Sequence, residues 1–144
     1  MKRLTLLLTT LFLLFSGQVS AHHLIISDHY VKETIPGTKI SAAYMHIHNH
    51  SEQQRKLVNV TSDISERIEL HQHIMDGDMM KMQQVNSIAI EANDYTVLQP
   101  HGYHIMIFAL QQRLHAGQEI ELSLYFDDQT TATIKVPVKG LARQ

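Results

Sequence analysis

The sequence predicts an all-β protein, a β-sandwich or a barrel, built as one domain. Short alternating segments recur at a spacing of roughly 8 to 12 residues, as is typical of such folds. Turn-forming pairs such as Pro36-Gly37 and Asp76-Gly77 separate these segments. No stretch has the periodicity of a long helix. At 144 residues, the chain has enough length for one hydrophobic core and little room for a second.

The first segment has the features of a secretory signal. Lys2 and Arg3 provide a positive start, an apolar stretch runs from Leu4 to Phe15, and small residues end at Ala21. An apolar stretch of about a dozen residues is shorter than the roughly 20 that span a bilayer. We therefore expect cleavage after Ala21, export to the periplasm without stable membrane insertion, and a mature domain over residues 22–144.

Nine segments are predicted to be strands. In chain order they cover residues 24–27, 41–48, 56–60, 67–73, 79–85, 95–98, 104–110, 119–126 and 130–136. The alternation is clearest in the second, where Ala43, Met45 and Ile47 share one face and His46 and His48 share the other. Residues 62–67 are predicted to form at most one helical turn.

The composition excludes several classes of protein. The chain has 11 His and 7 Met but no Cys, and its formal net charge is -2. It therefore has no disulfide framework, thiolate zinc site, cysteine nucleophile or cysteine-linked lipid, and no basic surface for nucleic acid. The Gly-x-Ser-x-Gly, His-Glu-x-x-His and glycine-rich phosphate motifs are also absent. We therefore interpret the chain as a metal-binding protein that is not an enzyme.

A hairpin signal lies between two groups of His and Met. An Asp-Gly pair such as the one at 76–77, flanked by extended segments, favours a type I′ turn. With these two residues as the loop, His71 would lie directly opposite Met82, and His73 opposite Met80. Directly opposed residues share a face, so one face of the hairpin would carry two imidazoles and two thioethers.

A second pair of candidate ligands lies on the strand predicted at 104–110. His104 and Met106 are two residues apart and therefore point to the same side, whereas Ile105 points to the other. With His71 and Met82 they form the pattern His-x10-Met-x21-His-x-Met. Random placement in a chain of this composition has an expected count of roughly 0.002.

This spacing resembles the signature of the PCu(A)C family of periplasmic copper chaperones. The likeness extends over nearly the whole mature chain, in segments 34–37, 42–45, 67–71, 80–82, 100–106 and 117–126. The sequence departs from the family pattern at His101, where glycine is common, and in the extra imidazoles of His46, His48 and His73. The resemblance implies a cupredoxin-like, Greek-key β-sandwich and a Cu(I) site whose ligands are His71, Met82, His104 and Met106.

The resemblance also implies a function. Members of the family bind Cu(I) and supply it for the CuA centre of cytochrome c oxidase, so the expected partners are apo subunit II of that oxidase, a Sco-type thiol protein, or both. Thioether sulfur and imidazole nitrogen suit the soft d¹⁰ Cu(I) ion, which supports the implied ligands independently. A role in copper storage or tolerance is an alternative.

Two further hypotheses remain open. Cleavage after Ala21 would expose the α-amino group of His22, which with His23 or His29 would form a Cu(II) site like that of histidine-brace oxygenases. The second hypothesis is an adhesion or assembly domain that works without a metal ion. A secondary Cu(II) site would use His22, His23 or the face that carries His46 and His48.

Some of the remaining His and Met residues are interpreted as supporting residues rather than ligands. They are His73, Met75, Met79 and Met80.

Overall fold

The structure is a computed structural model that describes residues 23–141. Within this part of the chain there are ten strands and no helix, so the all-β prediction is confirmed. The strands are β1 (Leu24–Lys32), β2 (Ser41–Asn49), β3 (Arg55–Thr61), β4 (Arg67–Asp76), β5 (Met79–Gln84), β6 (Ile88–Ile90), β7 (Asp94–Leu98), β8 (Tyr103–Phe108), β9 (Glu119–Phe126) and β10 (Thr131–Lys139). The predicted signal, residues 1–21, lies outside the described residues.

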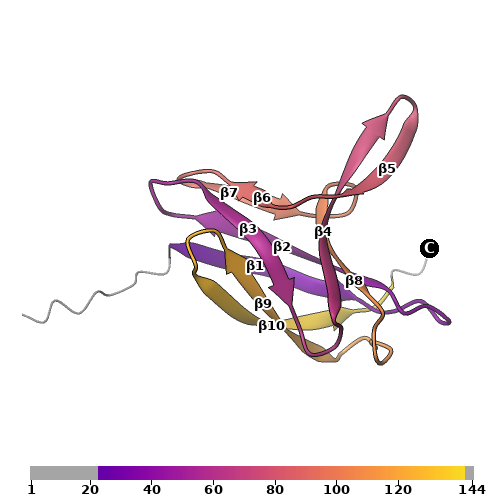
Figure 1. Cartoon of the computed structure of the whole chain (residues 1–144). Coiled ribbons are helices and arrows are strands. Elements are labelled where there is room, and N and C mark those ends of the chain that lie inside the picture. Colours follow the sequence, from indigo (N-terminus) through magenta and orange to yellow (C-terminus); the bar gives the residue numbers. More distant parts are fainter. Residues whose placement is uncertain (1–22, 142–144) are drawn as a thin grey trace, which may run out of the picture.

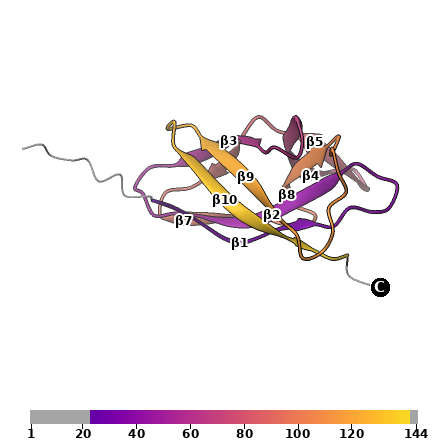
Figure 2. The same ribbon diagram turned by 90° about the horizontal axis from the view of Figure 1, so that it is seen from below.

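The strands form one hydrogen-bonded series that folds over on itself into two layers (Figures 1 and 2). The order is β5-β4-β8-β7-β2-β1-β10-β9-β3-β6, and β8 also pairs with β2. A short parallel pairing of β1 with β10 joins the layer that begins at β5 to the layer that ends at β6. Strand β5 is therefore an edge strand, and the β4–β5 hairpin extends away from the rest of the molecule (Figure 1).

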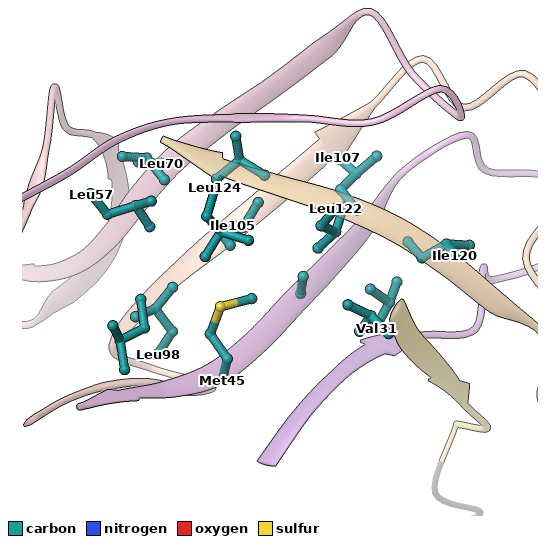
Figure 3. Packing of buried hydrophobic residues seen from close by; sticks show 14 of the residues in the cluster. Val31, Met45, Leu57, Leu70, Leu98, Ile105, Ile107, Ile120, Leu122 and Leu124 are labelled. Carbon is teal, nitrogen blue, oxygen red and sulfur yellow. The ribbon is translucent and has the colours of Figure 1, made fainter. Parts of the chain in front are cut away.

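Aliphatic side chains fill the space between the layers. From the first layer, Met45 and Ile47 of β2 and Ile105 of β8 are completely buried, as the predicted alternation requires. Leu122 and Leu124 of β9 meet them from the second layer (Figure 3). The opposite faces of β2 and β8 consequently point away from this core.

One local feature differs from the prediction: strand β6 was not predicted, because three residues are too few to show alternation. Residues 62–67, predicted to form at most one helical turn, contain no helix, since Ser62 and Ser65 form an antiparallel bridge around a turn at 63–64. The Ser65 hydroxyl hydrogen-bonds to the Phe108 carbonyl, and the Arg67 N–H donates to Ser65 Oγ at 2.9 Å. These tertiary hydrogen bonds hold the segment extended where it enters β4.

The β4–β5 hairpin forms, but its turn is centred one residue later than predicted. Asp76 pairs with Met79, so Gly77 and Asp78 are the two loop residues. Gly77 has a φ of 63°, whereas Asp78 is not among the residues with positive φ. A glycine with positive φ at the first loop position is the pattern of a type II′ turn rather than of the type I′ turn assumed in the prediction.

The later turn changes which residues face each other across the hairpin. His73 lies opposite Met82 rather than Met80, and His71 lies opposite Gln84 rather than Met82. The predicted direct pairing of His71 with Met82 is therefore wrong. Because each partner moves by two positions, the side chains stay on the predicted face, and Met82 is diagonal to His71.

Asn49, at the end of β2, is a buried polar residue whose side chain takes part in five hydrogen bonds. Its Nδ2 donates to the carbonyls of Gln53 at 2.8 Å and of Ile90 and Glu91 at 3.1 Å each. Its Oδ1 accepts from the backbone N–H of Ser51 at 3.0 Å and from the Ser51 hydroxyl at 2.7 Å. One buried side chain thus connects β2 with the loops beside β3 and β6.

We expect Asn49→Ala to lower the free energy of unfolding by about 2 to 4 kcal/mol, because it leaves several buried polar groups without partners. Urea denaturation of the metal-free chain would measure this loss. Asn59→Ala is the matched control, since Asn59 is an exposed residue of β3. Equal stability of the two variants would contradict the role given to Asn49.

Candidate metal site

His and Met side chains gather on the outer face of the first layer, on β4, β5 and β8. In β8, Ile105 and Ile107 are completely buried in the core. His104 and Met106 alternate with them and therefore point to the outer face together, as the strand pattern predicts. His104 is nevertheless only 2% exposed, because neighbouring side chains cover it.

The pairing of β4 with β8 brings the two predicted imidazole ligands together. His71 lies directly opposite His104, and Glu69 lies opposite Met106. The ring centroids of His71 and His104 are 5.9 Å apart. The sequence pattern placed each histidine on a strand, and only the family resemblance implied that these strands lie close together.

Met82 contributes from the edge of the sheet. It lies opposite His73, diagonal to His71, and it is 54% exposed. Long side chains in diagonal positions remain within reach of each other. The structure therefore brings His71, Met82, His104 and Met106 to one face, with Met82 on its solvent side.

A carboxylate orients His71. Glu69 Oε2 accepts a hydrogen bond from His71 Nε2 at 2.8 Å, and the two residues project from the same face of β4. In the neutral imidazole this bond places the proton on Nε2, so Nδ1 carries the free lone pair. His71 Nδ1 is buried and has no hydrogen-bond partner among the described residues. A carboxylate behind a histidine in this way is a common arrangement around metal ligands.

Glu69 is itself held in place. Arg67 Nε donates to Glu69 Oε1 at 2.8 Å, and the Arg67 guanidinium lies over the Phe108 ring at 4.4 Å from its centroid. The hydrogen bonds from His71 and then from Arg67 lower the pKa of Glu69 below its usual value. The carboxylate therefore stays ionised and remains an acceptor for His71.

A backbone carbonyl orients His104. His104 Nδ1 donates to the Gly102 carbonyl at 3.0 Å, so the neutral ring keeps its lone pair on Nε2. Burial lowers the pKa of His104, although the bond to Gly102 opposes this shift. A neutral imidazole with a free nitrogen is the form that binds a metal ion.

These features favour a soft metal ion. Within residues 23–141, no three side chains of His, Asp or Glu are arranged to hold a metal ion. A metal ion bound by His71 and His104 would therefore take its further side-chain ligands from the thioethers of Met82 and Met106. Such mixed sulfur and nitrogen ligands select soft ions rather than hard ones.

The sequence did not predict the residues that orient these ligands. Glu69 stands two residues before His71 on the same strand, and this spacing could have predicted that the two side chains share a face. The Gly102 carbonyl is a backbone group, so the pattern of side chains could not have predicted its bond to His104. His73 was interpreted as a supporting residue, and its ring centroid lies 5.0 Å from that of His104.

On the other predicted metal-binding face, His46 and His48 each have a polar neighbour within the protein. His46 Nδ1 lies 3.3 Å from Asp28 Oδ2, and His48 Nε2 lies 3.4 Å from Ser27 Oγ. His22, on which the histidine-brace hypothesis depends, lies outside the described residues.

A surface hollow of about 420 Å³ lies beside Ile64, Leu114 and Ile120, and no histidine lines it. None of the four predicted ligands lines this hollow, so it is separate from the candidate metal site.

Solved structures of copper-binding domains have this fold. The copper-bound PCuAC domain from PmoF2 superposes with a TM-score of 0.72 at 17% identity, covering 83% of this chain and 94% of that domain. The Cu(I) form of DR1885 from Deinococcus radiodurans superposes with a TM-score of 0.65 at 26% identity, covering 86% of this chain and 85% of that one. The cupredoxin-like β fold and the resemblance to PCu(A)C proteins are confirmed.

The family follows from the sequence comparisons. The model described as "Putative lipoprotein LpqE-like" matches residues 24–138, and the chain belongs to this LpqE-like family. "Putative lipoprotein Lxx21020" from Leifsonia xyli is 32% identical over 118 residues, which are 81% of this chain and 70% of the relative. "Uncharacterized protein RP573" from Rickettsia prowazekii is 34% identical over 99 residues, 68% of this chain and 55% of the relative.

Within residues 23–141, the structure contains no helix that is long and apolar enough to cross a bilayer.

In the metal-free chain we expect the pKa of His104 to lie below the ordinary value of about 6.5, because burial disfavours the charged ring. NMR titration of the His104 ring protons would measure this directly. At a pH between the lowered pKa of His104 in the folded chain and its ordinary pKa in the unfolded chain, only the unfolded chain binds a proton at this residue. The free energy of unfolding should therefore fall as the pH is lowered from about 6.5.

His104→Gln should remove this part of the pH dependence. A titration midpoint of His104 at or above about 6.5 would contradict the expectation.

Proposed function

We propose that this protein is a copper chaperone that binds Cu(I) through His71, Met82, His104 and Met106. The observation that carries the proposal is the arrangement of His71 and His104, which face each other across β4 and β8. Each uses one nitrogen in a hydrogen bond within the protein and keeps the other free. Similarity to the Cu(I) form of DR1885, at 26% identity, supports copper as the metal.

The chemistry of the four side chains fits Cu(I). A d¹⁰ ion accepts near-tetrahedral geometry without a ligand-field penalty and prefers polarisable sulfur with imidazole nitrogen. The thioethers carry no proton near neutral pH, so only the two histidines must be deprotonated. Their hydrogen bonds to Glu69 and Gly102 favour the tautomers that this binding requires.

The position of the site fits transfer rather than catalysis. Met82 lies on the edge strand β5 and is 54% exposed, whereas His104 is buried. A partner could displace the exposed thioether first and the imidazoles afterwards. This order of ligand exchange would allow copper to pass without free release, and we infer that the protein is a carrier and not an enzyme.

The proposed recipients are apo subunit II of cytochrome c oxidase, at its CuA centre, and a Sco-type thiol protein. The chain contains no cysteine, so any dithiol reduction must come from a partner. Relatives named as lipoproteins support an exported protein. We propose the periplasm as the location, with cleavage after Ala21 and a copper-binding domain over residues 22–144.

We expect Met106→Leu and Met82→Leu each to weaken Cu(I) binding at least tenfold, because leucine keeps the side-chain volume but lacks the sulfur donor. A competition titration with a colorimetric Cu(I) chelator would measure the affinity. Met79→Leu is the matched control, since Met79 is 62% exposed on the same strand but points to the opposite face of the hairpin. Equal affinities for all three variants would refute the proposed ligands.

X-ray absorption spectroscopy of the Cu(I)-loaded chain should show mixed sulfur and nitrogen scattering at one copper per chain. Sulfur scattering should decrease in Met106→Leu and stay unchanged in Met79→Leu. A first shell of nitrogen and oxygen alone would exclude the thioether site.

A further inference from the structure

Four imidazoles form a continuous row from the outer face of β4 and β8 to the turn that precedes β8. Neighbouring ring centroids are separated by 5.9 Å for His71 and His104, 5.0 Å for His104 and His73, and 5.6 Å for His73 and His101. The proposed Cu(I) site uses only the first pair. His73 and His101 remain as a second pair beside it.

The hairpin register places His73 in this row. His73 follows His71 by two residues on β4 and so projects from the same face, opposite Met82. Its backbone N–H donates to the Gly102 carbonyl at 3.2 Å, which attaches this part of β4 to the turn that carries His101. His73 Nδ1 is buried and has no hydrogen-bond partner among the described residues. Burial of an unpaired polar nitrogen is unfavourable unless a ligand or water satisfies it.

His101 occupies an uncommon backbone conformation. Its φ is 66°, a value that glycine adopts readily and other residues adopt at an energetic cost. The turn around it is closed by a hydrogen bond from Gly102 N–H to the Gln99 carbonyl at 3.0 Å. The chain thus keeps an exposed imidazole at a position where glycine would be more stable.

The distance between these two rings suits a shared metal ion. Imidazole nitrogens bind Zn(II) at about 2.1 Å, and two rings on one ion then have centroids about 5 to 6 Å apart. The observed 5.6 Å between His73 and His101 falls in this interval. Imidazole is a preferred ligand of borderline divalent ions, whereas the soft Cu(I) ion is better served by the thioethers.

We propose that His73 and His101 form a second metal site, for a borderline divalent cation such as Zn(II) or Cu(II), adjacent to the proposed Cu(I) site. Met82 lies directly opposite His73 and offers a further donor on the same face. Since no third His, Asp or Glu within residues 23–141 completes a cluster, water fills the remaining positions. The site therefore binds its ion more weakly than a site with three or four protein ligands.

Zn(II) is the probe for the test, because it has no redox chemistry and does not compete for thioethers as Cu(I) does. The full chain is titrated with Zn(II), and the backbone amides of His73 and Gly102 are followed by NMR. His101→Asn removes the imidazole at little conformational cost, since asparagine tolerates positive φ. His73→Gln removes the other imidazole.

We expect each of these variants to weaken Zn(II) binding, as reported by those amides, at least tenfold. His115→Asn is the control, because it removes an exposed imidazole outside the row. Unchanged Zn(II) affinity in His101→Asn, or shifts confined to residues 46–50, would overturn the proposal.

The Cu(I) affinity of the same variants separates this proposal from the proposed function. His101→Asn should bind Cu(I) like the unmodified chain, and Met106→Leu should bind Zn(II) like the unmodified chain while losing Cu(I). If His101→Asn loses affinity for both metals to the same extent, His101 belongs to the Cu(I) site and no second site exists. If Met106→Leu keeps its Cu(I) affinity, the proposed function fails while the Zn(II) result stands.

Discussion

The pairing of β4 with β8 is the constraint on which the rest of the site depends. Leu70 from β4 and Ile105 from β8 are buried beneath the sheet, and they are direct partners in the ladder. A shift by one residue would expose both and bury their polar neighbours, so the hydrophobic core selects one register. His71 and His104 are the next pair along this ladder. Their proximity is therefore a product of packing on the opposite face and needs no metal ion.

The hydrogen bonds behind the two imidazoles add orientation to this proximity. A carboxylate holds His71, and a turn carbonyl holds His104. The two acceptors differ in charge, and only Glu69 depends on a further side chain, Arg67. The outer face thus combines two oriented imidazoles with two thioethers that differ in position, Met106 on an inner strand and Met82 on the edge strand.

Much of the fold follows from local patterns in the sequence. Alternation in β2 and β8 correctly predicted which residues enter the core, and turn signals separated most strands. The hairpin register was predicted incorrectly, because Gly77 fits both as the second loop residue of a type I′ turn over 76–77 and as the first loop residue of a type II′ turn over 77–78. The His71–His104 pair was beyond local inference, since strands 33 residues apart become neighbours only through the packing of the whole sheet. Strand β6 has only three residues, which are too few to show an alternating pattern.

The exposure of Met82 has a chemical consequence. A thioether that is 54% exposed is accessible to dissolved oxidants, and methionine sulfoxide is polar where the thioether is a soft donor. Oxidation at this one position would leave the fold intact, because β5 contributes no residue to the hydrophobic core. Damage to the donor set would therefore be reversible by reduction of the sulfoxide. The edge position of β5 therefore leaves the sulfur of Met82 open to oxidation and to repair alike.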